Sequence, residues 1–503
     1  MPTLYDELPY PGLPFAETHP ERLAILATLF GMTPAPVDRC RVLELGCGDA
    51  GNLLPMAFEL PDCSFTGIDL AGSAIARGQE LAGHIGLTNL HLQQLDLLEF
   101  DSSFGEFDYI IAHGLYSWVP PQIRERILEI CKTHLAQNGV AYISYNAYPG
   151  GHLRDAIRRM MQFHVRGVAG IQEKCRRARA LLEFLVEARA EQDIYHAFLR
   201  SELQSFLERS PTHFFHDELS ECNNRFYFYE FVRDASRHGL QYLSEARLLT
   251  SQASTLPPDA VEKMLAFSQD DELVRQQYLD FVKLRNFRQS LLCHSTVQLQ
   301  RRVDTSRVKM MLAASVAKPA SAVPDISSPA AEEFRFPNGG SMSTNHPLAK
   351  AAILHLGGVW PAVVSFSNLL HTARSLVGRD SASASEPLEE DSAWLSDLLL
   401  KLYAAHFVEL HMYVPACSTK ISAKPVASAL VRAQLRTGHE VTNLRHASVS
   451  VDDESGRILL SLLDGTRDRA HLLAEMSERC EGVTAERLES SLEALAKMSL
   501  LVA

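Results

Sequence analysis

Residues 42–52 form a glycine-rich turn of the kind that binds a ligand through its main chain. The stretch reads V-L-E-L-G-C-G-D-A-G-N, an apolar strand with Glu44 near its end, then Gly46, Gly48 and Gly51. Glycines allow a sharp turn and let a ligand approach without a Cβ in the way. An apolar helical pattern follows, and a helix that begins there directs free N–H groups at the ligand. The spacing also matches a dinucleotide fingerprint, so the turn alone does not identify the ligand.

Two further acids narrow the choice. Asp69 ends a second strand, 65–68, where a carboxylate accepts both hydroxyl hydrogens of a ribose, in NAD and in S-adenosylmethionine alike. Asp96 follows a third strand, around 90–94, and is placed to accept an adenine amine. With Glu44 and the end of a fourth strand, 107–112, the combination resembles the class I S-adenosylmethionine-dependent methyltransferases. Those enzymes convert S-adenosyl-L-methionine to S-adenosyl-L-homocysteine, and we favour this cofactor over a nicotinamide.

The cofactor-binding residues follow from this alignment of strand ends. Gly46 and Gly48 would admit the methionine part of the cofactor, and Glu44 could bind its ammonium through ordered water or backbone. Ala50 stands where the common pattern has its third glycine, and Gly51 follows one place later. The predicted cofactor-binding residues are Glu44, Gly46, Cys47, Gly48, Asp69, Leu70, Asp96, Leu97 and His113.

Aromatic residues follow the fourth and fifth strands, where the methyl acceptor should enter. Methyl transfer from a sulfonium is an in-line displacement that needs alignment more than acid–base groups. Tyr116 and Trp118 are candidates for an aromatic acceptor wall, or they are ordinary core aromatics. His113 could act as a base or fix the loop by hydrogen bonds. The predicted catalytic residues are Tyr116, Trp118, His113 and Tyr145, and the predicted substrate contacts are Tyr5, Asp6 and Tyr148.

The elements that position these residues alternate between strands and helices from 41 to 145, which predicts a doubly wound parallel sheet of the Rossmann type. Helical patterns from about 153 to 207 interrupt it. Segments 240–243 and 289–294 would supply the sixth and seventh strands. Before the sheet, residues 1–20 are rich in Pro and aromatics and form an arm, either packed on the core or lying as a lid over the cofactor. Thr18-His19-Pro20-Glu21 predicts a capping box that opens a helix through Phe30.

These boundaries give a domain plan. Residues 1–300 form the cofactor-binding methyltransferase domain, with a helical insertion at 153–225 that we expect to mediate dimerisation and a regulatory-type region at 214–297. An Ala/Ser/Pro-rich linker follows at 301–335. Residues 336–503 form a mainly helical middle part and a C-terminal part that looks like a degenerate winged helix.

Composition limits the partners and the compartment. The 503 residues carry a formal net charge of −13, which disfavours nucleic acid as a partner. The nine cysteines are dispersed, with no C-x-x-C pair and no His/Cys cluster at metal-ligand spacing, so we expect reduced thiols in the cytoplasm and no metal. No apolar stretch approaches the roughly 18 residues of a spanning helix, and no signal peptide is evident, so we expect no membrane insertion.

Several stretches resemble one bacterial family, the methyltransferases that carry a methyltransferase regulatory domain. They are Tyr5-Asp6 with Pro9-Tyr10-Pro11, Thr18-His19-Pro20, the run 113–120 (H-G-L-Y-S-W-V-P), Ser144-Tyr145-Asn146, 214–219 (F-F-H-D-E-L) and 286–294 (N-F-R-Q-S-L-L-C-H). Its best-known members are rickettsial lysine methyltransferases that act on an outer-membrane protein. The resemblance implies the same activity, a homodimer formed through the region after the fifth strand, and additional middle and C-terminal domains.

We therefore expect an enzyme that methylates lysine side chains of a protein, of the surface or outer-membrane type. A small-molecule or tRNA methyltransferase is the first alternative, and a non-catalytic cofactor-binding regulatory module is the second. The intact set of Glu44, Gly46, Gly48, Asp69 and Asp96 argues against the second alternative.

Overall fold

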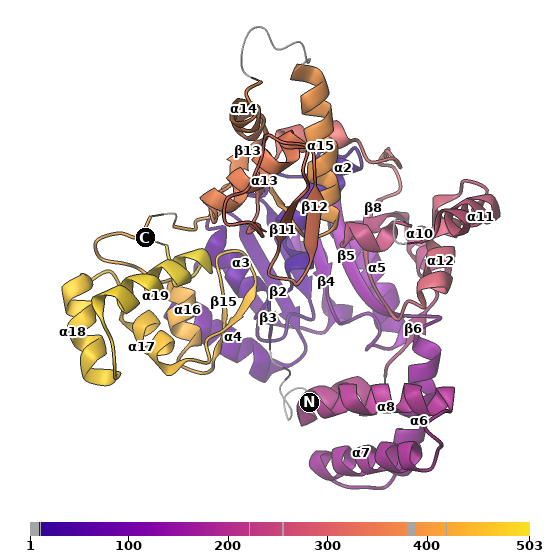
Figure 1. Cartoon of the computed structure of the whole chain (residues 1–503). Coiled ribbons are helices and arrows are strands. Elements are labelled where there is room, and N and C mark those ends of the chain that lie inside the picture. The colour runs from indigo at the N-terminus through magenta and orange to yellow at the C-terminus, as the bar shows by residue number, and fades with distance from the viewer. Residues whose placement is uncertain are drawn as a thin grey trace.

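The computed structural model describes residues 10, 12–220, 222–253, 256–379, 388–418 and 420–502. A central sheet occupies the middle of the molecule, and helices surround it (Figure 1). Within the described residues no helix is long and apolar enough to cross a bilayer.

The central sheet has eight strands in the described part of the chain, seven of them in the order β3-β2-β1-β4-β5-β8-β7. β1 to β5 run parallel, and β8 runs antiparallel to both β5 and β7. The predicted sheet, with late sixth and seventh strands, is confirmed. The strands are β1 (Arg41–Leu45), β2 (Ser64–Asp69), β3 (Leu90–Gln94), β4 (Phe107–Ala112), β5 (Leu135–Ala147), β6 (Arg225–Phe226), which pairs with β5 off this path, β7 (Leu240–Glu245) and β8 (Phe287–His294).

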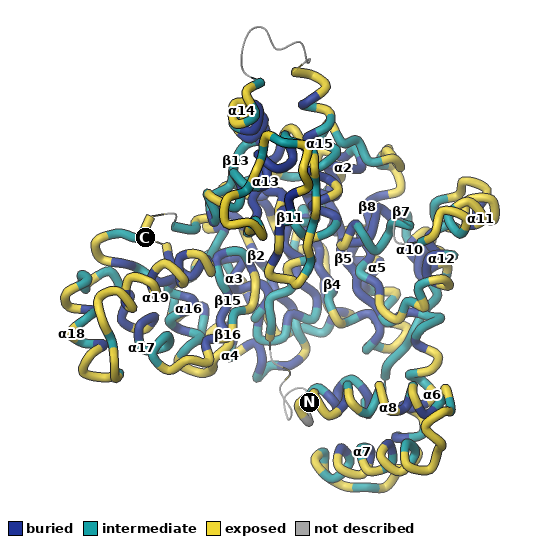
Figure 2. The backbone as a smooth tube through the Cα atoms, viewed as in Figure 1, coloured by how far each residue is buried: buried dark blue, intermediate teal, exposed yellow. Residues whose placement is uncertain are grey.

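The two faces of the sheet bury alternate residues, as the two-residue period of a strand requires. On β4, Tyr109 and Ile111 belong to one hydrophobic cluster, and Ile110 and Ala112 belong to the other. Among the helices that contribute residues to the first cluster are α2 (Pro20–Leu29), α3 (Leu53–Glu59) and α4 (Gly72–His84). The second includes residues of α5 (Pro121–His134) and α10 (Phe228–Arg237). Figure 2 shows the resulting buried centre.

The start of α2 differs from the predicted capping box. His19 is the N-cap residue, and its Nδ1 accepts a hydrogen bond from the Glu21 N–H at 3.2 Å. Thr18 instead donates its hydroxyl to the Phe15 carbonyl at 2.8 Å. The prediction that Thr18 caps this helix is therefore wrong, because its hydroxyl is committed to the arm that precedes the helix. Short 3-10 turns complete this part of the chain: η1 (Ala16–Thr18), η2 (Leu97–Glu99) and η3 (Ser102–Phe104).

A helical insertion follows β5 and projects from one end of the sheet (Figure 1). It has a hydrophobic core of its own, with Ile157, Leu182 and Phe206 at its centre. Its elements are α6 (Gly151–His164), α7 (Ile171–Glu187), α8 (Ile194–Leu207), α9 (Pro211–Phe214) and the π-helix η4 (Phe215–Leu219). Between β7 and β8 lie η5 (Leu248–Ser251), α11 (Pro258–Ser268) and α12 (Glu272–Lys283).

The segment predicted to be a linker, 301–335, is folded in part: 308–317 contributes buried residues, whereas 320–331 is irregular and mostly exposed. Val308 and Ala313 are buried in the same core as the sheet's first face, and the strand that holds Ala313 is the centre of a small sheet, β13-β9-β14. Small Ala and Ser side chains pack closely there, although their composition is also that of a flexible loop. The middle elements are η6 (Thr305–Met310), β9 (Leu312–Ala314), β10 (Lys318–Pro319), β11 (Glu332–Arg335), β12 (Ser341–Thr344), α13 (Pro347–Val359), β13 (Val364–Ser365), α14 (Phe366–Leu376), α15 (Leu388–Ala404) and β14 (Glu409–His411).

The C-terminal domain has a separate core and lies beside α3 and α4 (Figure 1). Leu460, Leu492 and Leu500 are fully buried within it. Its elements are α16 (Ala429–Gln434), β15 (Glu440–Thr442), β16 (Ser448–Ser450), α17 (Glu454–Leu462), α18 (Arg469–Arg479) and α19 (Ala485–Lys497).

Candidate active site

The glycine turn after β1 leaves open space beside its main chain. Gly46 and Gly48 have positive φ angles of +73° and +58°, which L-residues with a Cβ rarely adopt. A Cβ added to Gly48 would meet no atom within 4 Å, whereas one on Gly46 would lie 3.0 Å from Leu115. The turn therefore offers a ligand a stretch of bare backbone at Gly48.

The displaced third glycine has a structural reason. Ala50 occupies the common glycine position at φ +61°, a left-handed conformation that costs roughly 1–2 kcal/mol. A Cβ on Gly51 would lie 2.4 Å from the carbonyl carbon of Gly12. Gly51 is thus required because the N-terminal arm crosses the turn at this point.

Glu44 presents a buried carboxylate that is only half satisfied. Its Oε1 accepts a hydrogen bond from Asn52 Nδ2 at 2.8 Å, and its Oε2 is buried without a partner in the described chain. Burial, helped by the nearby charges of Asp69 and Asp49, raises the pKa of Glu44 to about 8, against the opposing effect of Asn52. An unpaired buried oxygen of this kind fits a cationic or hydrogen-bonding ligand group.

The other two predicted carboxylates lie at the ends of β2 and β3. Asp69 accepts the Gly48 N–H through Oδ2 and the Ala71 N–H through Oδ1, each at 2.8 Å. Asp96 caps η2 by accepting the Leu98 N–H at 3.0 Å. Of their predicted neighbours, Leu70 and Leu97 differ: Leu70 is 53% exposed and Leu97 is 8% exposed. Cys47 is buried against Gly67.

The N-terminal arm joins the glycine turn to the loop after β4. The Phe15 N–H donates to Asn52 Oδ1 at 2.9 Å, and the Phe15 ring stacks on His113 with centroids 3.8 Å apart. The arm therefore contacts both the glycine turn and the loop after β4. Tyr5 and Asp6, the predicted substrate contacts, lie outside the described residues.

His113 is held neutral between the arm and β5. The Tyr142 hydroxyl lies within hydrogen-bond distance of His113 Nδ1, at 2.9 Å, and accepts the Gln289 amide N–H at 3.0 Å. Burial lowers the pKa of His113 to about 4. A base is most effective near its operating pH, so this geometry favours the loop-fixing role over proton abstraction.

The predicted aromatic wall divides into buried and accessible members. Tyr116 and Tyr145 are 2% and 1% exposed and pack on Phe231, so they belong to the core below the site. Trp118 is half-buried in the loop after β4, where its backbone N–H donates to the Leu115 carbonyl. The structure thus supports the core reading for Tyr116 and leaves Trp118 accessible.

Tyr148 lies in a second aromatic group, at the end of β5. Its hydroxyl donates to Asp155 Oδ2 at 2.7 Å, and its ring stacks on His152 with centroids 3.9 Å apart. Burial and the Asp155 carboxylate raise the pKa of Tyr148 to about 12, so the phenol keeps its proton. Phe287, 40% exposed, lies 6.5 Å from His113 between the centroids of their rings.

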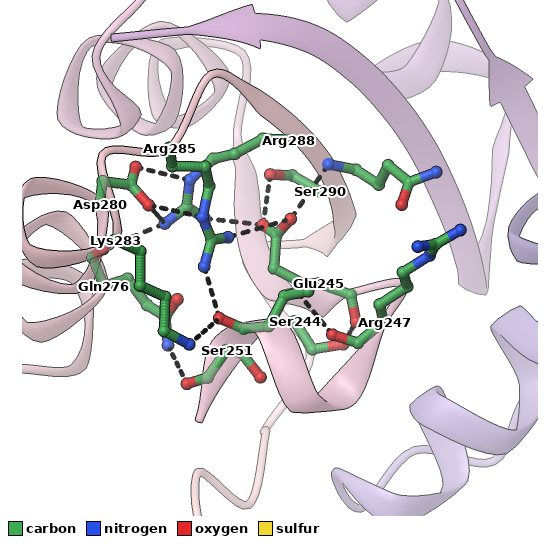
Figure 3. Close-up of polar contacts among 12 residues, drawn as sticks. Ser244, Glu245, Arg247, Ser251, Gln276, Asp280, Lys283, Arg285, Arg288 and Ser290 are labelled. Carbon is green, nitrogen blue, oxygen red and sulfur yellow. Dashed lines mark hydrogen bonds and ion pairs between the residues drawn. The ribbon is translucent and has the colours of Figure 1, made fainter. Parts of the chain in front are cut away.

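A buried ion-pair network in the regulatory region lies beside β5 (Figure 3). Arg288 on β8 is fully buried between Asp280, at 2.8 Å, and Glu245, at 2.7 Å. Burial opposes ionisation, but Arg288 and Arg285 hold the pKa of Glu245 below its usual value. Arg288 is also the register partner of Tyr145 across β5 and β8. The paired charges cancel, and they fix the strand that backs the predicted acceptor side.

The sequence did not single out Asn52, Phe15 or His446 as site residues. Asn52 ends the glycine turn, and its position there is the one signal that could have marked it. His446 reaches Asn52 from 394 residues away, a contact that no local pattern encodes.

Comparisons with known proteins decide the family. The methyltransferase domain family matches residues 43–141, a family described as a predicted methyltransferase regulatory domain matches 210–294, and the PKMT C-terminal winged helix domain matches 423–499. An uncharacterized protein of Rickettsia prowazekii is 32% identical over 93% of this chain and 84% of the relative. The chain belongs to the PKMT family, the protein lysine methyltransferases.

Solved structures of this family agree over nearly the whole molecule. PKMT2 from Rickettsia typhi matches with a TM-score of 0.87 and 27% identity, covering 98% of this chain and 100% of that protein. The same protein in complex with AdoHcy (S-adenosyl-L-homocysteine) matches with a TM-score of 0.87 and 26% identity. The expected S-adenosylmethionine-dependent protein lysine methyltransferase, with its regulatory and winged-helix domains, is confirmed.

Proposed function

We propose that this PKMT binds S-adenosylmethionine at the carboxyl ends of β1, β2 and β3 and methylates lysines of a surface or outer-membrane protein before its export. The observation that carries the proposed site is the turn itself. Bare backbone at Gly48 faces open space, and Glu44 beside it keeps an unpaired buried oxygen. Ligands of open α/β sheets bind at this edge.

The cofactor, when bound, supplies a methyl group on a cationic sulfur. Glu44 would hold its ammonium, Asp69 its ribose and Asp96 its adenine, while Cys47, Leu70 and Leu97 line the approach. Asp69 does this from a carboxylate that already fixes the Gly48 and Ala71 N–H groups, so one side chain shapes the turn and faces the ligand.

The acceptor lysine must reach the methyl group without its proton. The amine has an unperturbed pKa near about 10.4, and desolvation lowers it. Trp118 and Tyr148 are accessible rings that would desolvate the amine and attract cationic groups, each by roughly 0.5–2 kcal/mol. His113 would hold the loop, and Tyr116 and Tyr145 would support it from below.

We further propose that the enzyme acts in the cytoplasm as a homodimer. All nine cysteines are free thiols, as a reducing compartment requires. The insertion, α6 to α8, carries the exposed apolar side chains Phe163, Phe184 and Ile194, which a second copy would cover.

Labelled cofactor tests this proposal. The purified enzyme, methyl-labelled S-adenosylmethionine and a lysine-rich outer-membrane protein should give label on lysine, located by mass spectrometry of peptides. Asp69→Ala serves as the matched inactive control. Label in nuclease-sensitive or low-mass material, in place of protein, would contradict the proposed acceptor.

A further inference from the structure

A turn of the C-terminal domain reaches the glycine turn of the cofactor site. His446 lies between β15 and β16, is 2% exposed, and places Nε2 3.0 Å from Asn52 Oδ1. Its backbone N–H donates to Glu59 Oε1 at 3.3 Å. Asn52 is the N-cap residue of α3 and Glu59 is its last residue. One residue of the C-terminal domain therefore contacts both ends of the helix that follows the glycine turn.

The Asn52 side chain is oriented by its partners. Its oxygen accepts from the Phe15 N–H at 2.9 Å and from His446, and its nitrogen donates to Thr18 Oγ1 at 2.9 Å and to Glu44 Oε1 at 2.8 Å. This set uses both amide hydrogens and both lone pairs of the oxygen. The amide is thereby oriented so that it donates a hydrogen bond to one oxygen of Glu44 and leaves the other oxygen for the ligand.

The proton of His446 is placed by the same geometry. Because Asn52 Oδ1 has no hydrogen to give, His446 Nε2 must carry one and donate it. Its Nδ1 is buried without a partner in the described chain, which suits a bare nitrogen and not an N–H. His446 thus acts as a neutral donor in this contact.

The turn that carries His446 is built to hold this position. His446 has a φ of +54°, a left-handed conformation. Asn443 Oδ1 accepts the N–H groups of Arg445 and Ala447, each at 3.0 Å, and the Leu444 N–H donates to the Ser499 carbonyl at 2.9 Å. The strained residue is therefore held by hydrogen bonds within its own domain, in addition to its contact with the other.

We propose that His446 is a positioning residue of the methyltransferase, which sets the affinity for S-adenosylmethionine through Asn52 and Glu44. The C-terminal winged-helix domain is then a structural part of the cofactor site. This inference rests on the placement of the cofactor at Glu44 in the function proposed above.

A double-mutant cycle on the full-length enzyme tests it, with AdoHcy binding measured by calorimetry. His446→Leu should raise the dissociation constant about tenfold, the equivalent of one hydrogen bond. His446→Gln carries the same backbone cost but keeps an N–H donor. Its dissociation constant for AdoHcy should lie within about twofold of that of the parent enzyme. In an Asn52→Ala background, His446→Leu should add no further loss, because its partner is gone. Steady-state kinetics should show a raised KM for S-adenosylmethionine with kcat nearly kept.

Arg445→Gln is the matched control in the same turn. Arg445 binds the Pro361 carbonyl and Glu409 of the middle part, so its loss weakens the domain contact without touching Asn52. Its AdoHcy affinity should stay within about twofold of the parent, as expected for a residue outside the pair. If His446→Leu does not fold, His446→Asn tolerates the positive φ, is too short to reach Asn52, and should show the same loss.

The outcomes separate the two proposals. Unchanged AdoHcy affinity in His446→Leu, or equal losses in the parent and Asn52→Ala backgrounds, would overturn the role of His446. Unchanged affinity in Asp69→Ala would instead overturn the placement of the cofactor site itself.

Discussion

The buried carboxyl of Glu44, which belongs to the proposed site, also makes the stability of the free enzyme depend on pH. Its pKa of about 8 lies above the value of about 4.3 that it has in an unfolded chain. Between these values the folded protein keeps a proton that the unfolded chain loses. The free energy of unfolding therefore falls as pH rises through that window.

Glu44→Gln should remove this penalty. We expect the apparent Tm of the variant, relative to the parent, to increase from pH 5 to pH 8 by roughly 2–4 °C for each kcal/mol of penalty removed. Scanning fluorimetry without ligand measures it. Glu183→Gln, at an exposed position on α7, is the control and should show no trend. If the difference in apparent Tm between Glu44→Gln and the parent is the same at every pH, Glu44 is not a buried carboxyl that keeps its proton.

Trp118 is the accessible member of the predicted aromatic wall. Trp118→Ala should lower kcat roughly fivefold, because about 1 kcal/mol of contact between the ring and the acceptor cation is lost. The Kd for AdoHcy should stay near that of the parent enzyme. Trp394→Ala, which removes a half-buried indole that stacks on His346 in the middle part, is the control. Equal turnover in Trp118→Ala and the parent would place this ring outside the acceptor site.

At the residue scale, the sequence predicted where three carboxylates lie relative to the strands, and their roles remain predictions. Glu44, Asp69 and Asp96 are all found at the carboxyl edge of the sheet. Burial was harder to foresee: Tyr116 and Trp118 lie two residues apart in one loop, yet Tyr116 is in the core and Trp118 is accessible. The burial of each side chain depends on whether it packs against α10, a helix that is remote in sequence.

The glycine turn shows what a local element can encode. Gly48 has φ +58° and open space where a Cβ would lie, so Gly48→Ala should cost the fold only about 1–2 kcal/mol. The added methyl would occupy the proposed ligand space, and AdoHcy binding should fall at least tenfold. Calorimetry and thermal melts measure the two effects.

Gly105→Ala is the matched control for that variant. Gly105 has φ +72° and equally open surroundings, but it lies in the turn before β4. Its backbone cost should be similar, with no change in AdoHcy affinity. If both variants bind AdoHcy as tightly as the parent, the open space at Gly48 is not the ligand site.

Strands were easier to predict than connections. The runs 240–243 and 289–294, which are mainly apolar, became β7 and β8, and most residues of both strands are buried. The region 301–335 misled because Ala313 and Ala314 are buried small residues whose composition matches that of a loop. Composition alone does not distinguish close packing from flexibility.

At the level of the assembled protein, the C-terminal domain and the insertion make opposite use of their surfaces. The C-terminal domain meets the core through polar contacts, among them the buried hydrogen bond of His446 with Asn52 and the Arg445–Glu409 ion pair, in which only Arg445 is buried. The insertion instead projects outward (Figure 2). Its exposed residues include the aromatic Phe163 and Phe184. The first surface is therefore satisfied within one chain, and the second is where the predicted dimer would form.

Phe184 on α7 offers the sharpest test of that dimer. Its side chain is 61% exposed, and a second copy covering it would gain on the order of 1.5–3 kcal/mol from its burial. Phe184→Glu would place a charge in that interface, so sedimentation should shift from dimer to monomer. Phe267→Glu, at a 64% exposed Phe on α11 outside the insertion, should leave the dimer intact. If the parent sediments as a monomer, or if only Phe267→Glu dissociates it, the insertion is not the dimer interface. Activity per chain should survive in the Phe184→Glu monomer, because the glycine turn, its carboxylates and His446 all belong to one chain.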